Sequence, residues 1–313
     1  MANISPQNIV KGIIQIIRPV HWVKNLSVFA ALIFSQNLFD PLLFSKVVWA
    51  FVAFCLSASA TYIFNDITDA DRDRLHPIKR YRPIASGKLP IPIAVVLAIG
   101  LVLISLILAK SLSYIFYVLI LVYLLLQAFY SLVLKNLPVI DIIVIATGFI
   151  IRVYAGAFVI DAHLSVWFLL CVISVALFLA SGKRRAELGA LGSAAGTRES
   201  LSKYPPELLN SYVTMFGNAA WMSWALFTFF ESPRVSTPLW ILLAEISKAA
   251  AINKLLMVTI PFTIFGIMRY QSLIFENRSE APEKILLTDI PLVASVAIWI
   301  TLVIFILYTG ISI

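Results

Sequence analysis

Long apolar runs separated by short polar stretches make up most of the sequence. Nine runs meet or approach the roughly 20 residues that a helix needs to cross the hydrocarbon core of a bilayer, about 30 Å thick. The predicted spans are residues 13–38, 43–64, 91–109, 112–134, 139–160, 165–181, 208–230, 254–275 and 289–309. A further apolar segment, 237–247, is too short to span and carries Glu245, so we predict an interfacial or re-entrant piece there. The pattern predicts an all-α polytopic membrane protein, with residues 1–313 forming a single transmembrane domain.

The composition agrees with lipid as the solvent of this chain. Hydrophobic residues make up 61% of the 313 residues, charged residues make up 13%, and the mean hydropathy is +0.95. Soluble domains carry about 25% charged residues, so this chain lacks the charge for a fully wetted surface. The net charge of +8 does not indicate nucleic-acid binding, because the basic residues lie between the apolar runs. In such places Lys and Arg act as topology signals and as ligands for anionic groups, so we predict membrane lipids as partners and no nucleic acid.

The basic residues also predict the orientation. With the N-terminus in the cytoplasm, 18 of the 24 Lys and Arg residues fall on the inner side, and one, Arg152, lies within a span. The outer loops hold the other five, Lys46, Lys110, Arg234, Lys248 and Lys254. Inner loops of membrane proteins carry an excess of Lys and Arg. We therefore predict an integral plasma-membrane protein with its N-terminus inside, its C-terminus outside, and two long cytoplasmic polar stretches, 65–90 and 182–207.

A cluster of acids follows the second predicted span, in the stretch NDITDADRD at 65–73. In a continued helix, Asp66, Asp69 and Asp73 are three and four residues apart and share one face. Such like charges repel one another unless a cation sits between them, and carboxylate and amide oxygens are hard ligands suited to Mg²⁺. The predicted Mg²⁺ ligands are Asn65, Asp66, Asp69 and Asp73. The alternative is a solvated loop helix in which the acids are incidental.

A basic loop comes next, with the sequence HPIKRYRPIASG at 76–87. Pro77 and Pro83 exclude a continuous helix, so we predict a shaped loop. The candidates to bind phosphate groups opposite the metal are Lys79, Arg80 and Arg82. Taken alone they are better explained as topology signals, but next to the acids the sequence leaves both interpretations open.

The spacing of these acids, at the end of the second span, resembles the first Asp-rich motif of the UbiA superfamily of intramembrane prenyltransferases. The resemblance implies a nine-helix transmembrane bundle, with Mg²⁺-bound diphosphate in a central cavity open to the cytoplasm, and it implies that Asp66, Asp69 and Asp73 are the catalytic acids. Family members carry a second Asp-rich motif after the sixth span, whereas ASGKRRAEL at 180–188 holds one acid and three bases. We therefore expect one metal ion fewer and more phosphate in this site.

That basic stretch and the 76–87 loop are similar to one branch of the family, the decaprenyl-phosphate phosphoribosyltransferases. RPVHWVKN (18–25), YSLVLKNLPVIDIIVIATGFIIRVYAG (130–156) and EKILLTDIPL (283–292) match as well, so the resemblance covers about residues 18–308. It implies phosphoribosyl pyrophosphate (PRPP) as donor and a polyprenyl phosphate as acceptor. The implied product is polyprenyl-phosphoryl-5-phosphoribose, a precursor of decaprenyl-phosphoryl-arabinose for cell-wall polymers.

In the predicted reaction, Mg²⁺ held by Asp66 and Asp73 neutralises the departing pyrophosphate, while an oxygen of the lipid phosphate attacks the anomeric carbon. The lipid phosphate is already ionised at neutral pH, so catalysis reduces to positioning and electrostatic stabilisation. Donor and acceptor bring three anionic groups, which the basic clusters at 79–82 and 183–185 match in charge. The predicted substrate-binding residues are Lys24, Asn25, Lys79, Arg80, Arg82, Tyr130, Lys135, Asp141, Arg152, Lys183, Arg184 and Glu187.

Some of these residues have a structural alternative. Lys24 either faces the cavity, as the resemblance implies, or is a lysine that extends its amine to the interface. Asp141 and Arg152 share a face of the fifth span, but about 16 Å separates them along the helix, so each needs another partner. Glu187 either replaces the missing acidic motif or pairs with Arg184.

Two other classes of function compete with this interpretation. A conventional prenyltransferase, which moves a prenyl group from a prenyl diphosphate to an aromatic acceptor, would carry a second DxxxD run near 182–200, and none is there. A transporter or lipid carrier would be expected to show an internal repeat and broken helices at the midplane of the membrane. The sequence shows no such repeat, and its acids lie at one membrane face.

Overall fold

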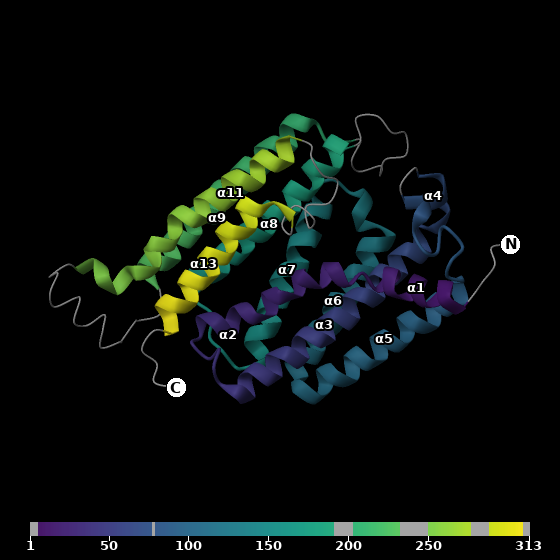
Figure 1. The fold of residues 1–313 in the computed structure, drawn as a ribbon, viewed down its shortest axis with the longest axis horizontal. Helices are drawn as coiled ribbons and strands as arrows, with labels where there is room; N and C mark the ends of the chain where they lie inside the picture. Colours follow the sequence, from purple (N-terminus) through teal and green to yellow (C-terminus); the bar gives the residue numbers. More distant parts are fainter. Residues whose placement is uncertain (1–5, 77–78, 191–202, 232–249, 277–287, 309–313) are drawn as a thin grey trace. The chain divides into compact units, whose positions relative to one another are not determined.

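The computed structural model describes residues 6–76, 79–190, 203–231, 250–276 and 288–308, and every regular element in these ranges is helical (Figure 1). In chain order, with η marking 3₁₀ helices, the elements are α1 Pro6–Ile17, η1 Pro19–Phe29, α2 Ala30–Phe34, α3 Pro41–Thr68, α4 Ala70–Leu75, η2 Lys79–Tyr81, α5 Ile91–Leu112, α6 Tyr114–Leu132, η3 Leu134–Asn136, α7 Ile140–Val159, α8 Val166–Ala190, α9 Pro206–Phe230, η5 Ala250–Thr259, α11 Ile260–Phe275 and α13 Ile290–Tyr308. The prediction of an all-α fold is confirmed.

Eight helical segments of the described chain are long and apolar enough to cross a membrane. They correspond to eight of the nine predicted spans. The remaining predicted span corresponds to α9, which has 25 residues but contains Asn210 and Asn218, whose amide groups lower its hydropathy. The protein is therefore an integral membrane protein, and the count of nine spans stays a prediction. The segment 237–247 lies outside the described residues.

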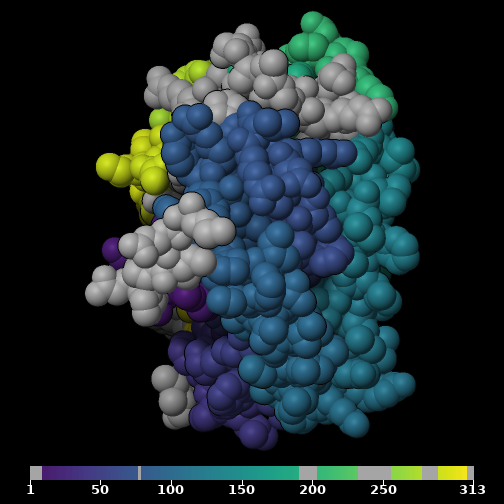
Figure 2. All heavy atoms as spheres, turned by 90° about the vertical axis from the view of Figure 1, so that its right-hand side faces the viewer, coloured from purple at the N-terminus to yellow at the C-terminus, as the bar shows by residue number. Residues whose placement is uncertain are grey.

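Apolar side chains lie exposed along α5, one of the helices that cover the face seen in Figure 2. They form a stripe at intervals of three and four residues, made of Val96, Ile99, Leu103 and Ile107. Soluble proteins rarely expose a continuous apolar surface of this kind. This stripe is suited to contact with lipid chains.

Close contacts divide the chain into two compact units. Of the described residues, the first unit holds 6–30, 45–76, 79–161 and 203, and the second holds 31–44, 162–190, 204–231, 250–276 and 288–308. The acids at the end of α3 belong to the first unit, whereas the basic stretch 183–185 belongs to the second. The single domain of residues 1–313 stays a prediction.

The first predicted span, 13–38, is not one continuous α-helix. Helix α1 ends at Ile17, Arg18 adopts the left-handed region with φ 52° and ψ 62°, and the 11-residue 3₁₀ helix η1 begins at Pro19. Such a helix is unusually long, since 3₁₀ runs beyond three or four residues are uncommon. It lies very close to α7, because a Cβ atom added to Gly156 would be only 2.0 Å from the carbonyl oxygen of Val28.

An apolar cluster fixes α1 against the end of α3 that leads into the acidic stretch. Its buried members are Ile16, Ile63, Ala70, Ile84, Leu89 and Ala94. They come from α1, α3, α4, the turn after η2 and α5, so five segments close in sequence meet around one core. Between helices in lipid, such side chains stabilise the arrangement through close packing and not through removal from water. This core holds the acidic stretch and the basic loop next to each other.

The sixth span extends further than predicted. Residues 165–181 were expected to be followed by a polar loop, but α8 continues to Ala190. The added stretch contains Lys, Arg, Ala, Glu and Leu, which are good helix formers, and no proline. The basic stretch 183–185 therefore lies on a helix. Directly before this stretch, Gly182 allows α8 to approach α11 closely, since a Cβ atom added to Gly182 would be 2.9 Å from the ring of Tyr270.

Candidate active site at the end of helix α3

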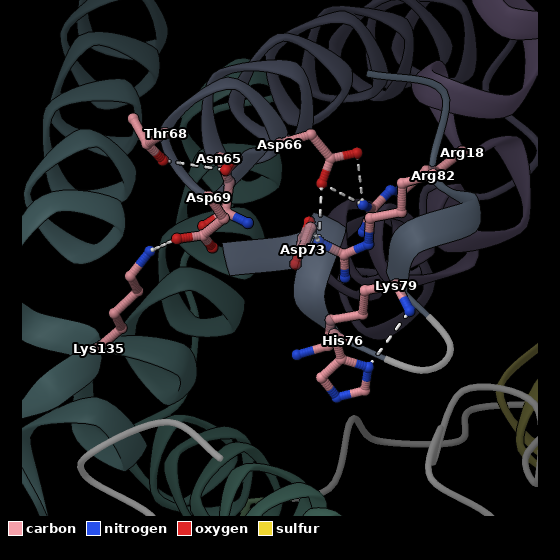
Figure 3. A network of polar contacts seen from close by, with 10 residues as sticks. All are labelled: Arg18, Asn65, Asp66, Thr68, Asp69, Asp73, His76, Lys79, Arg82 and Lys135. Atoms are coloured by element: carbon pink, nitrogen blue, oxygen red, sulfur yellow. Dashed lines mark hydrogen bonds and ion pairs between the residues drawn. The ribbon is translucent and has the colours of Figure 1, made fainter. Parts of the chain in front are cut away.

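The helix of the acidic stretch is interrupted at one residue, Asp69, where α3 ends. Asp69 lies between α3 and α4 with φ −96° and ψ 2°. Backbone hydrogen bonds still link successive turns, from the Asp69 amide to the Asn65 carbonyl at 3.0 Å and from the Asp73 amide to the Asp69 carbonyl at 2.8 Å. Asp66 and Asp73 lie on a common side, since both contact Arg82, whereas Asp69 departs from the shared face that a continued helix predicts. Figure 3 shows the Asp69 side chain directed away from the side on which Asp66 and Asp73 meet their partners.

Two arginines hold Asp66 and Asp73 (Figure 3). Arg18 Nη2 donates to both carboxylate oxygens of Asp66, at 2.5 and 2.8 Å. Arg82 Nη1 donates to Asp66 Oδ1 at 3.1 Å and to Asp73 Oδ2 at 2.7 Å, so one nitrogen bridges the two carboxylates. Asp66 is 1% exposed and Asp73 is 4% exposed. From the sequence we expected a bound cation to relieve the repulsion between these acids. The guanidinium groups of the two arginines also relieve it.

The third acid has a partner of its own. Lys135 Nζ donates to Asp69 Oδ1 at 2.6 Å, and the lysine is buried at 4% exposure. Lys135 lies on η3, between α6 and α7. The pair therefore ties the end of α3 to the turn between two spans, and it brings together two residues that were predicted for the site from distant parts of the sequence.

Burial affects the protonation of Asp73, on α4 beyond the end of α3. It raises the pKa of the Asp73 carboxyl above its ordinary value, while the charge and the hydrogen bond of Arg82 act in the opposite direction. The negative charge of Asp66 also raises this pKa, whereas the positive charge of Lys79 lowers it. An ionised Asp73 therefore depends on the cations around it.

The basic loop begins after α4, and its residues 77–78 lie outside the described part of the chain. Lys79 is half-buried on η2, and its backbone amide donates to His76 Nδ1 at 3.3 Å. Arg80 is exposed; its Nη2 donates to the Tyr81 hydroxyl at 2.7 Å, and its guanidinium lies 4.9 Å from the centre of that ring. The prediction of a shaped loop without a continuous helix is confirmed in the described residues, which contain the short 3₁₀ helix η2. Of the three predicted phosphate ligands, Arg82 contacts the acids directly, through Asp66 and Asp73.

A second polar network lies deeper in the first unit, around Arg152 of α7. Its guanidinium donates to Asn25 Oδ1 at 2.7 Å, to the Gly148 carbonyl at 2.5 Å and to the Tyr123 hydroxyl at 2.9 Å. The ring of Tyr123 lies 4.8 Å from the guanidinium carbon. No carboxylate contacts Arg152 in the described part of the chain. The arginine instead joins η1, α6 and α7 through neutral acceptors and aromatic rings, which agrees with the prediction that Asp141 is not its direct partner.

The remaining predicted residues of the first unit are placed as follows. Lys24 is half-buried on η1, next to the fully buried Asn25. Tyr130 is half-buried near the end of α6, and Asp141 is fully buried in the first turn of α7. Asn25 is committed to structural contacts, since its Nδ2 also donates to Cys55 Sγ at 3.2 Å. Whether each of these four residues binds substrate stays a prediction.

The predicted residues of the second unit lie on the last turns of α8. Arg184 is fully buried and forms an ion pair with Glu187, three residues later. Lys183 is half-buried. Arg185 Nε donates to Asn210 Oδ1 at 2.6 Å on α9. Pairing of Glu187 with Arg184, one of the two alternatives drawn from the sequence, is confirmed, and the substrate-binding role of these residues stays a prediction.

The donor set of the acidic stretch fits a magnesium ion that is shared with a phosphate ligand. The described residues contain no group of three or more acids, histidines or cysteines close enough to enclose a metal ion. Mg²⁺ does not require such a group, because it is commonly held by one or two carboxylates together with phosphate oxygens and water. Asp66 and Asp73 supply two carboxylates that a single nitrogen atom of Arg82 touches. Asp69 lies further off, paired with Lys135.

Sequence reasoning did not assign two residues of these networks. Arg18 was counted only as an orientation signal and as part of a family-like stretch, yet it makes a two-oxygen contact with Asp66. The signal that could have found it is an arginine directly before a proline, at the polar end of the first span. Tyr123 was not considered, because a tyrosine in an apolar run gives no sign of facing a buried arginine.

Comparison with known proteins places the chain in a family. Residues 25–184, just over half of the chain, match the UbiA prenyltransferase family. The protein belongs to the UbiA prenyltransferase family. This UbiA-family chain is 36% identical to the decaprenyl-phosphate phosphoribosyltransferase of Corynebacterium glutamicum, over 97% of this chain and 89% of that protein. It is 38% identical to the decaprenyl-phosphate phosphoribosyltransferase of Mycolicibacterium smegmatis, over 91% of this chain and 88% of that protein.

The fold of this UbiA-family protein is similar to that of a solved relative. A UbiA homolog from Archaeoglobus fulgidus, solved with GPP and Mg²⁺ bound, matches it with a TM-score of 0.68. The match covers 95% of this chain and 99% of that one, at 19% sequence identity. The prediction of a UbiA-type transmembrane fold is therefore confirmed.

Proposed function

We propose that this protein transfers the 5-phosphoribosyl group of PRPP to a polyprenyl phosphate and releases pyrophosphate. The observation that carries the proposal is similarity to two proteins named decaprenyl-phosphate phosphoribosyltransferase, at 36% and 38% identity. Each alignment covers about nine-tenths of this chain and of the relative. The product, polyprenyl-phosphoryl-5-phosphoribose, would serve as a precursor of cell-wall arabinan.

The charges around the acidic stretch support a phosphorylated sugar as donor. Arg18 and Arg82 lie against the acids, and Lys79 acts electrostatically on Asp73. PRPP carries a diphosphate and a separate 5-phosphate, and the acceptor lipid brings a third anionic group. Guanidinium and ammonium groups are the side chains that bind such groups most strongly. An aromatic acceptor would need only one cation for its carboxylate.

Asp66 and Asp73 are the residues that would hold Mg²⁺; Asn65 directly precedes Asp66 on α3, and Asp69, paired with Lys135, lies further off. When bound there, the ion supplies Lewis-acid neutralisation of the diphosphate charge. Arg82 bridges the same two acids, so it is placed to bind the diphosphate next to the ion. Lys135 keeps Asp69 from adding an uncompensated negative charge close to the anionic donor.

The reaction forms one carbon–oxygen bond and breaks another. An oxygen of the lipid phosphate attacks the anomeric carbon of the ribose, and the bond from that carbon to the diphosphate breaks, with its electron pair leaving on pyrophosphate. The lipid phosphate is already ionised at neutral pH, so the protein need not supply a general base. Its side chains orient the two anionic substrates and stabilise the charge that develops between them. Roles for Lys183, Arg184 and Glu187 stay predictions.

Transfer from labelled PRPP tests the proposed function. We expect purified protein with Mg²⁺, polyprenyl phosphate and ribose-labelled PRPP to move label into the organic phase, and EDTA to stop this until Mg²⁺ is restored. Parallel reactions contain a labelled prenyl diphosphate and hydroxybenzoate. Label that stays in the aqueous phase with PRPP but reaches hydroxybenzoate in the parallel reaction would assign the protein to the conventional prenyltransferases.

The proposed orientation places the acids at the cytoplasmic face. Both native cysteines are buried, so single exposed cysteines can report the side on which a segment lies. In intact cells, we expect a membrane-impermeant maleimide to label Lys110→Cys, at the end of α5, and not Arg72→Cys, on α4; both positions are exposed. Inverted vesicles should give the opposite pattern. Labelling of Arg72→Cys in intact cells would reverse the orientation.

A further inference from the structure

Arg18 and Arg82 engage the carboxylate oxygens that a metal ion would need. Arg18 donates to both oxygens of Asp66, and Arg82 donates to one of these and to one oxygen of Asp73. Three of the four oxygens of the two acids are therefore in contact with a guanidinium group. A metal ion that binds Asp66 and Asp73 therefore competes with these arginines for the same carboxylate oxygens.

The charge of this group decides when the exchange is favourable. Two acids and two arginines sum to zero, and Lys79 adds positive potential near Asp73. A divalent cation on its own would bring two uncompensated positive charges next to two guanidinium groups in a partly buried place, where like charges repel more strongly than in water. A diphosphate supplies the missing negative charge. It also offers both guanidinium groups phosphate oxygens in place of the carboxylates.

From these contacts we propose that Arg18 and Arg82 make metal binding depend on the diphosphate, so that the ion and the diphosphate enter the site together. The guanidinium groups pass from the carboxylates to phosphate oxygens, and the carboxylates pass to the ion. Arg18 thereby becomes a donor-binding residue. The inference deepens the proposed function, since it requires a donor with a diphosphate group, but it does not require that this donor be PRPP.

The backbone of Arg18 supports a role beyond that of a surface counter-ion. Its φ of 52° lies in the left-handed region, which residues other than glycine rarely adopt. This conformation separates α1 from η1, and the guanidinium carbon lies 5.1 Å from the centre of the Tyr62 ring. Strained backbone of this kind persists where the surroundings fix it, and it concentrates at ligand sites. The fold thus holds Arg18 at the end of α3 at a conformational cost.

Equilibrium dialysis of the purified full-length protein against radioactive Mn²⁺, with and without inorganic pyrophosphate, tests this coupling. At equal free Mn²⁺, we expect pyrophosphate to raise the metal retained by the wild-type protein at least tenfold. Arg18→Gln and Arg82→Gln should each bind Mn²⁺ alone about tenfold more tightly than the wild type, because one competing cation is gone. In both variants pyrophosphate should improve retention by a smaller factor.

Arg74→Gln is the matched control. It removes the same charge from α4, but Arg74 pairs with Asp71, and both side chains are largely exposed. Its Mn²⁺ binding should equal that of the wild type. Arg18→Lys keeps the positive charge but makes a weaker contact with Asp66. Without pyrophosphate it should therefore retain as little Mn²⁺ as the wild type, and pyrophosphate should raise its Mn²⁺ retention by a smaller factor.

Two results would overturn the inference: wild-type protein that retains as much Mn²⁺ without pyrophosphate as with it, or arginine variants that bind Mn²⁺ no more tightly than Arg74→Gln. The two proposals can fail separately. Pyrophosphate-dependent Mn²⁺ retention in a protein that does not use PRPP would end the proposed function and support the coupling. Transfer from PRPP without that dependence would do the reverse.

Discussion

Replacing Asp73 by asparagine should lower the rate of transfer from PRPP by about a thousandfold while the protein still folds and inserts. The amide keeps the shape of the side chain but removes one of the two carboxylates that Arg82 bridges. A metal ion contributes several kcal/mol to stabilising the charge of the transition state. Each 1.36 kcal/mol is a factor of ten in rate, so losing most of that contribution gives a change of this size. Label transfer at saturating PRPP and Mg²⁺ measures it, and Asp73→Ala should be at least as inactive.

Asp71→Asn provides the comparison for this loss. Asp71 lies on the same short helix as Asp73, its side chain is 94% exposed, and its ion pair is with the exposed Arg74. The two variants change the net charge equally, yet only Asp73→Asn alters the buried group. We expect Asp71→Asn to keep the wild-type rate. Full activity in Asp73→Asn, or equal losses in both, would contradict the role assigned to Asp73.

Replacing Gly156 by alanine should destabilise the protein by about 3 kcal/mol, near the upper end of the range for overpacking a core. The added methyl group would lie 2.0 Å from the carbonyl oxygen of Val28 and 2.9 Å from its carbonyl carbon. Both are backbone atoms, so no side chain can turn aside, and η1 must move away from α7. The shift would also lengthen the hydrogen bond between Arg152 and Asn25, because Arg152 lies one turn before Gly156 on the same face of α7. We expect the midpoint of thermal unfolding in detergent to fall by more than about 5 °C.

Gly100→Ala is the control for this substitution. A Cβ atom at Gly100, in the middle of α5, would meet no other atom within 4 Å. Alanine also favours a helix by up to about 1 kcal/mol over glycine. The unfolding midpoint of this variant should equal or exceed that of the wild type. If Gly156→Ala unfolds at the same temperature as Gly100→Ala, the close approach of η1 to α7 does not hold the first unit together.

The spans could be predicted from sequence because the length of an apolar run is set by the thickness of the bilayer. The fifth span, expected at 139–160, is α7 at Ile140–Val159. The end of α8 was missed by nine residues, since hydropathy detects where a helix leaves lipid and not where it stops being a helix. The first span was taken as continuous although Pro19 lies within it. Part of the expected α-helix is instead the 3₁₀ helix η1, which packs against α7, more than a hundred residues away in sequence.

The residue types of the candidate site were predictable, whereas their pairing was not. The acids at 65–73 stand out by spacing alone. That Arg18 and Arg82 meet Asp66, while Lys135 meets Asp69, depends on contacts over as many as 66 residues of chain. The expectation that the three acids require a metal ion overlooked these side-chain cations. Arg152 shows the same limit, because its partners Asn25 and Tyr123 lie on two other segments.

Helix α3 has 28 residues and is therefore about 42 Å long, more than the roughly 30 Å of hydrocarbon in a bilayer. In the proposed orientation, its last turns, which include Asp66, extend into the layer of lipid headgroups on the cytoplasmic side. A polyprenyl phosphate anchored in the membrane keeps its own phosphate at that depth. With that orientation, a sugar phosphate dissolved in the cytosol would reach the same level, so the two reactants would meet without the lipid leaving the bilayer or the sugar entering it.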